Sequence, residues 1–156
     1  MAEDANIVVL VADGEHARVV RFVPGKGLHT EAELTSEFAH KRDQDLASDR
    51  PGSSSQDNTW GHDAYTPRHD PHRMAKQRFA YEIAKELNAI CGAGSVDKLV
   101  LVAPAHVMVD IRHKLSAETA ALAVGTIEKD LVKTPDHELW PHLRQWVPAA
   151  HAPRVS

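Results

Sequence analysis

The sequence predicts a single α/β domain built on a mixed β-sheet. Three observations carry this prediction: apolar runs separated by turn signals fill the first part of the chain, a strongly periodic helical segment follows, and strand-like and helical segments then alternate. A chain of 156 residues, 42% hydrophobic and 26% charged, lies within the range of one globular domain. We expect the domain to cover residues 1–147 and the tail 148–156 to be frayed.

The N-terminal part predicts three antiparallel strands. Residues 7–12 form an apolar run rich in β-branched side chains, and residues 16–23 form a second one. Asp13 and the glycine after it supply turn chemistry between them, with Asp13 expected to shape the turn through its side chain. The Pro-Gly-Lys-Gly sequence at 24–27 predicts another turn, and residues 28–38 alternate as a half-buried edge strand would.

A long polar segment separates these strands from the first predicted helix. Residues 40–70 are rich in Ser, Asp, Gly and His. Connections in compact domains usually have about 4 to 6 residues, so a loop of roughly 30 residues is either functional or disordered. We expect the working surface of the protein in this loop and at the start of the helix that follows it.

The helix after the loop has the clearest pattern in the chain. Asp70 predicts an N-cap and Pro71 the first helical position. Apolar residues recur at helical spacing until Gly92 and Gly94, and they are Ala75, Phe79, Ile83, Leu87 and Ile90.

The last third alternates between strands and helices. Residues 98–103 predict a strand buried on both faces, followed by a helix with one apolar side; residues 123–128 predict a further strand. Thr134 and Pro135 open a last helical segment, in which Pro141 is expected to cause a break or kink. The resulting β-β-β-α-β-α-β-α order resembles the ribonuclease-H-like architecture.

Composition bears on location and partners. The N-terminal apolar run stops at Asp13, too short for a membrane span and wrongly flanked for a secretory signal, so we expect a cytoplasmic protein with no membrane insertion. The single cysteine, Cys91, has no intramolecular disulfide partner and is expected to pack as a small hydrophobic residue. A net charge of -4 argues against a broad electrostatic grip on nucleic acid but leaves a local basic patch open.

No catalytic motif is complete, so we expect no enzymatic activity and no cofactor. The phosphate loop, the dinucleotide fingerprint and the nucleophile elbow are all absent. His137 and Glu138 begin a metalloprotease-like run, but His142 comes one residue too late for H-E-x-x-H. A two-metal nuclease needs carboxylates from several elements, and the strand ending at Ala103 carries none.

The histidines of the loop allow two interpretations. His62, His69 and His72 lie near Asp63 and Asp70, so a transition-metal site can be drawn. Zinc motifs fix two close ligands and then a second pair, whereas here only two histidines are close and no cysteine joins them. The three histidines are therefore weak candidates, and we expect them to be exposed and no metal to be resident.

Basic and aromatic residues around the loop define a candidate binding surface for RNA or another partner. Two interpretations remain open: an RNA-facing patch with aromatic side chains for stacking, or a solvated helix face with aromatics that fold the loop back onto the sheet. The candidate residues are Arg50, Gly52, Trp60, Tyr65, Arg68, His69, Arg73 and Lys76.

Ordered motifs along nearly the whole chain resemble the bacterial host-attachment protein family. These are Ala-Asp-Gly-x-x-Ala-Arg-Val-Val at 12–20, Asp-Arg-Pro-Gly at 49–52, the 70–87 helix with its Phe-Ala pair, Leu-Val-Leu-Val-Ala-Pro at 99–104 and Lys-Asp-Leu at 129–131. The resemblance implies a relationship to the middle domain of archaeal and eukaryotic peptide-chain release factors. In that domain the corresponding loop carries Gly-Gly-Gln.

This sequence has no Gly-Gly-Gln. Gln56 lies in the corresponding loop after three serines, so the backbone freedom that two glycines would give is missing. We expect a non-catalytic domain that binds the ribosome, tRNA or other RNA through residues 42–73. The alternatives are a protein-interaction module in attachment or envelope physiology, and a hydrolase of an ester such as peptidyl-tRNA in which Gln56 or His62 positions water.

Overall fold

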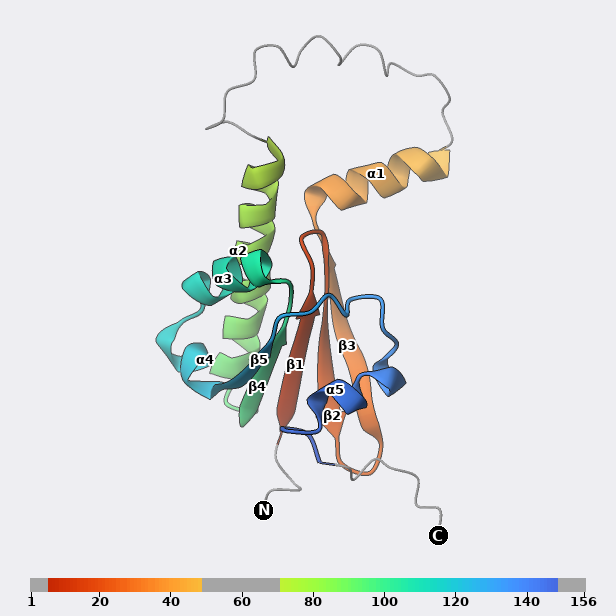
Figure 1. Cartoon of the computed structure of the whole chain (residues 1–156). Coiled ribbons are helices and arrows are strands. Elements are labelled where there is room, and N and C mark those ends of the chain that lie inside the picture. The colour runs from red at the N-terminus through yellow and green to blue at the C-terminus, as the bar shows by residue number, and fades with distance from the viewer. Residues whose placement is uncertain (1–5, 49–70, 149–156) are drawn as a thin grey trace.

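The computed structural model describes residues 6–48 and 71–148, and these form a five-stranded mixed sheet with helices against it (Figure 1). The predicted α/β class is therefore confirmed. The strand order is β3-β2-β1-β4-β5. The elements are β1 (Ile7–Ala12), β2 (His16–Val23), β3 (Gly27–Thr35), α1 (Glu37–Ser48), α2 (Pro71–Gly92), β4 (Lys98–Val102), α3 (Ala105–Lys114), α4 (Ala117–Leu122), β5 (Ala123–Ile127), η5 (Asp136–Glu138) and α5 (Trp140–Leu143).

The sheet combines an antiparallel half and a parallel half. β1 pairs antiparallel with β2, and β2 pairs antiparallel with β3. β4 runs parallel to β1, and β5 runs parallel to β4. All six residues of β1 are buried, as expected for a central strand covered on both faces.

Two apolar layers cover the sheet (Figure 1). On one face α2, α3 and α4 pack against the inward side chains of the strands. On the other face lies the chain after β5, which is mostly irregular and includes η5 and α5. Its buried contributions are Leu131, Leu139, Leu143 and Val147. The last predicted helix is therefore short, in keeping with the break expected at Pro141.

The first hairpin turn is shaped by Asp13, as predicted. Its Oδ1 accepts hydrogen bonds from the backbone N of Glu15 at 2.8 Å and of His16 at 2.7 Å. A short side chain that accepts backbone donors two and three residues ahead stabilises a tight turn. The carboxylate is thus occupied by the backbone of its own turn.

The segment predicted as one strand over 28–38 and a loop from residue 40 is instead a strand followed by a helix. β3 ends at Thr35, and α1 contains residues 40–48. Ser36 follows the strand directly and caps the helix, because its Oγ accepts a hydrogen bond from the backbone N of Ala39 at 3.1 Å. The part of the predicted loop at 49–70 lies outside the described residues.

A bulge in β3 serves the packing of the C-terminal segment. The pairing shifts between Val19 and Val20, so that Glu31 is skipped in the strand register and faces no single residue of β2. Next to it, Thr30 donates its backbone N to Asp136 Oδ2 at 2.8 Å and its Oγ1 to Asp136 Oδ1 at 2.7 Å. The bulge thereby connects the edge strand to η5.

Within the part of the chain that the structure describes, no helix combines the length and the apolar character needed to cross a bilayer.

Candidate nucleic-acid interface

Two of the eight predicted binding residues can be placed, and both lie in the first turns of α2. Arg73 and Lys76 are exposed there. The other six fall at 49–70, outside the described residues, as do Gln56 and two of the three histidines proposed for a metal, His62 and His69. The ester-hydrolase and metal interpretations rest on those positions and stay untested predictions.

Lys76 lies on the face of α2 that packs against the sheet further along the helix, but at a point beyond the end of the strands. It lies seven residues before Ile83 and eleven before Leu87, and a spacing of seven or eleven places residues on one helix face. Ile83 and Leu87 are fully buried against the sheet. Lys76 instead extends over the β1–β2 turn, where a Cβ atom at Gly14 would lie 3.3 Å from its Cε. The aliphatic stem covers the turn, and the side chain remains exposed.

The first turns of α2 and α3 enclose a groove beside Lys76, which we call the α2–α3 groove. It has a volume of about 490 Å³. Its two permanent cations, Arg73 and Lys76, face one acid, Asp110. The remaining lining residues are His72, Gln77, His106 and Val109. The permanent charge of the groove is therefore slightly cationic.

A second line of side chains follows the outer side of α2, which we call the α2 outer stripe. It consists of Met74, Arg78, Tyr81 and Lys85, spaced so that they share one helix face. Met74 is 53% exposed and Tyr81 is 54% exposed. Alternating cationic and apolar or aromatic groups can bind phosphates and stack on bases.

The start of α2 is positive along its whole circumference. Residues 71–81 include Arg73, Lys76 and Arg78 and no acid, in a chain whose net charge is -4. The first acid along the helix is Glu82. The backbone amides at a helix N-terminus carry partial positive charge, and the first turn of the described helix adds no acid to offset it. The local field therefore opposes the sign of the protein as a whole.

Arg42, where the predicted binding segment was taken to begin, lies in α1 and joins that helix to the first hairpin turn. Its guanidinium donates two hydrogen bonds to the Glu15 carboxylate, one of them from Nη1 to Oε2 at 3.3 Å. This hydrogen bonding lowers the pKa of Glu15; burial opposes the shift, while the charges of Arg42, His16 and Lys76 add to it. Arg42 is thus part of a helix and makes an ion pair within the fold. The prediction of a loop from residue 40 is therefore wrong at this position.

Cys91 packs as predicted, on the buried side of α2. It is 6% exposed within the helix-covered core, and burial raises the pKa of its thiol. A thiol held in its protonated form is a poor nucleophile. Across residues 6–48 and 71–148, no three side chains of His, Cys, Asp or Glu converge on a common point.

Sequence reasoning found the cations of the first α2 turns but missed the outer stripe and the contribution of α3. The stripe has a sequence signal, since Met74, Arg78, Tyr81 and Lys85 recur at helical spacing. The groove has none, because His106 and Val109 reach it only through the packing of α3 beside α2.

The chain is similar to one protein family in sequence and to solved structures in fold. The model of a family described as "Protein required for attachment to host cells" matches residues 8–143. A solved structure titled "Archaeal protein" gives a TM-score of 0.53 at 9% identity, over 96% of this chain and 36% of that one. The archaeal translation termination factor aRF1 gives a TM-score of 0.47 at 10% identity, over 78% and 29%. No curated protein sequence matches the chain.

The family match and the structural matches differ in how much of each protein they cover. The family model spans most of the chain, whereas the chain covers only 36% and 29% of the two solved chains. At such low identity, the similarity to the solved structures concerns the fold.

Proposed function

The chain belongs to the family of proteins required for attachment to host cells, and from this membership and the surface of α2 we propose that it is a non-catalytic, cytoplasmic RNA-binding domain. One observation carries the proposal: the first three turns of α2 hold three exposed cations and no acid, although the chain is acidic overall. Affinity for a polyanion depends on such local positive charge, because each neutralised phosphate releases counterions.

The geometry supports single-stranded RNA better than a duplex. The α2 outer stripe places Tyr81 between Arg78 and Lys85, so that a base can stack on the ring while neighbouring phosphates meet the cations. Arg73 and Lys76 extend the cationic surface around the helix to the α2–α3 groove. A strand that crosses the start of α2 would meet the three cations of its first turns, Arg73, Lys76 and Arg78.

The proposal extends to the RNA of the translation machinery. The support is the relationship to the middle domain of release factors that the resemblance to the host-attachment family implies, because in that domain the loop before the corresponding helix reaches peptidyl-tRNA. Attachment to host cells would then depend on this protein indirectly, through RNA in the cytoplasm.

Ultraviolet cross-linking in cells tests the proposal. The chain is purified under denaturing conditions and the RNA attached to it is sequenced, for the wild type and for the triple variant Arg73→Ala, Lys76→Ala and Arg78→Ala. The matched control is Lys26→Ala, Lys129→Ala and Lys133→Ala, which removes the same charge from exposed positions away from α2. Recovery of ribosomal or transfer RNA that is lost only in the α2 variant supports the proposal. Equal recovery from both variants would refute it.

A further inference from the structure

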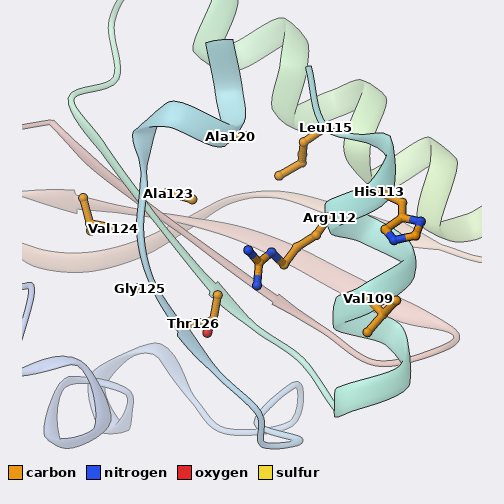
Figure 2. A pocket seen from close by; sticks show the side chains of 9 residues that line it. All are labelled: Val109, Arg112, His113, Leu115, Ala120, Ala123, Val124, Gly125 and Thr126. Carbon is orange, nitrogen blue, oxygen red and sulfur yellow. The ribbon is translucent and has the colours of Figure 1, made fainter. Parts of the chain in front are cut away.

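A second groove lies between α3 and the edge strand β5, and it shares Val109 with the α2–α3 groove (Figure 2). Its volume is about 550 Å³. Its apolar lining includes Val109 and Val124, which are 53% and 46% exposed. Leu115, Ala120 and Ala123 complete the apolar part. Parallel strands are normally covered on both faces. The exposed apolar side chains beside β5 show that this end of the sheet is covered incompletely.

The permanent charge of the groove is cationic and comes from Arg112. Arg112 and His113 line it and no acid does. Figure 2 shows the Arg112 side chain extending from α3 toward β5, whereas His113 points away from the strand. Within the described ranges Arg112 forms no ion pair. Together with Lys114, these residues make the last turn of α3 basic. The groove thus offers a guanidinium to a carboxylate that the described part of the fold does not supply.

The edge of β5 offers backbone hydrogen bonds beside that guanidinium. The O of Ile127 accepts a hydrogen bond from the backbone N of Ala103 at 3.0 Å, so Ile127 directs its polar groups toward β4. Because successive residues of a strand direct these groups to opposite edges, those of Thr126 point outward. A bulge at Val124, which has no pairing partner in β4, limits the regular edge to the end of the strand.

We propose that this groove binds an extended acidic peptide of a partner protein, which pairs with β5 at Thr126 and places a carboxylate on Arg112. Side chains two residues apart in an added strand share a face, so one such position of the peptide places its carboxylate on Arg112 and the next packs an apolar side chain on Val109 or Leu115. Charge selects the partner: the absence of acids from the lining favours a peptide with Glu or Asp over a basic one. The cationic residues of the two sites differ, since Arg112 lines this groove and Arg73 and Lys76 line the α2–α3 groove.

Fluorescence anisotropy with defined peptides tests the proposal on the full chain. The probe is a short fluorescein-labelled peptide of Ser-Glu-Ser-Val repeats, in which Glu and Val alternate along one face of the strand (the Glu-Val peptide). It is compared with the same peptide carrying Lys in place of Glu (the Lys-Val peptide) and with a Glu-Val peptide methylated on its backbone nitrogens. We expect binding of the Glu-Val peptide alone. Arg112→Ala should weaken it about tenfold, whereas Lys129→Ala, which removes an exposed cation outside the groove, should leave it unchanged.

Each of the contrary outcomes would overturn the proposal. Absence of saturable binding up to about 1 mM peptide removes the site. Equal affinity for the Lys-Val peptide would show that the charge of Arg112 does not select the partner. Equal affinity for the methylated peptide would show that the peptide does not pair with β5. A dimer in sedimentation that Val124→Glu dissociates assigns the groove to a second copy of the chain instead. Circular dichroism of Arg112→Ala verifies that the variant is folded.

Discussion

The indole of Trp146 fills the space in which a side chain at position 125 would begin. A Cβ atom at Gly125 would lie 2.2 Å from Cε2 and from Cζ2 of Trp146, far inside van der Waals contact. The glycine in β5 therefore lets the segment around Trp146 pack against the sheet, and this segment in turn supports the edge strand.

Replacement of Gly125 by Ala should lower the free energy of unfolding by about 1–3 kcal/mol or more, because an aromatic ring and its support must move. Urea denaturation measures the effect. Gly92→Ala is the control, since no atom lies within 4 Å of a Cβ at that position. Combination with Trp146→Ala should cost less than the sum of the two single variants. Strict additivity would show that the ring is not the obstacle.

Arg18 and Asp136 should be strongly coupled. The Arg18 side chain is 12% exposed, its Nη1 donates to Asp136 Oδ1 at 2.9 Å, and its Nη2 donates to Leu131 O at 3.3 Å. Because this guanidinium holds the segment before η5 on the sheet, a double-mutant cycle with Arg18→Ala and Asp136→Ala should give a coupling of about 1–3 kcal/mol.

The Arg21–Glu31 pair is the comparison for that cycle. Its side chains are 22% and 38% exposed, and its nearest N–O distance is 3.0 Å. More exposed pairs contribute less, so its coupling should be below about 1 kcal/mol. Equal couplings for the two pairs would contradict the role given to Arg18.

The ion pair of Glu15 with Arg42 should make stability depend on acid pH. Hydrogen bonding to Arg42 holds the folded pKa of Glu15 below its ordinary 4.5. The contribution of the pair is therefore complete above pH 4.5 and is lost as the pH falls through the lower folded value. The difference in unfolding free energy between the wild type and Glu15→Gln should be constant above that pH and shrink below it. Its size should stay under about 1 kcal/mol, because the pair is partly exposed. A difference that grows with acid would contradict this assignment.

Tyr81 should contribute to RNA affinity through its ring. Tyr81→Ala is expected to weaken binding of single-stranded RNA by about 1–3 kcal/mol, whereas Tyr81→Phe keeps the stacking face and should bind nearly as the wild type does. The side chain is 54% exposed, so neither change should alter the unfolding temperature much. Similar losses for both variants would point to the hydroxyl rather than to stacking.

The regular elements with strong local signals were predictable from sequence. The structure confirms three predictions that rest on local constraints. These are the start of α2 at its proline, the turn shaped by the side chain of Asp13 and the buried strand β4. Helix α1 was missed because the alternation of β3 was extended past Thr35, although Ser36 is a good N-cap residue.

The candidate sites were only partly predictable. Arg73 and Lys76 were found because basic residues cluster in sequence around the start of α2. The two grooves flank α3, and their shapes depend on how that helix packs between α2 and β5. Long-range packing of this kind leaves no local pattern, so Arg112 and Val109 could not be singled out.

The salt dependence of RNA binding by the purified chain tests the central claim most directly. Affinity for a labelled single-stranded RNA is measured across a salt series for the wild type, for Arg73→Ala, Lys76→Ala and Arg78→Ala combined, and for the control with Lys26, Lys129 and Lys133 changed to Ala. If all three α2 cations contact phosphates, their loss should weaken binding and reduce the slope of log K against log salt by about 2. The control should keep the slope of the wild type. An unchanged slope in the α2 variant, or no RNA binding by the wild type at low salt, would contradict the account.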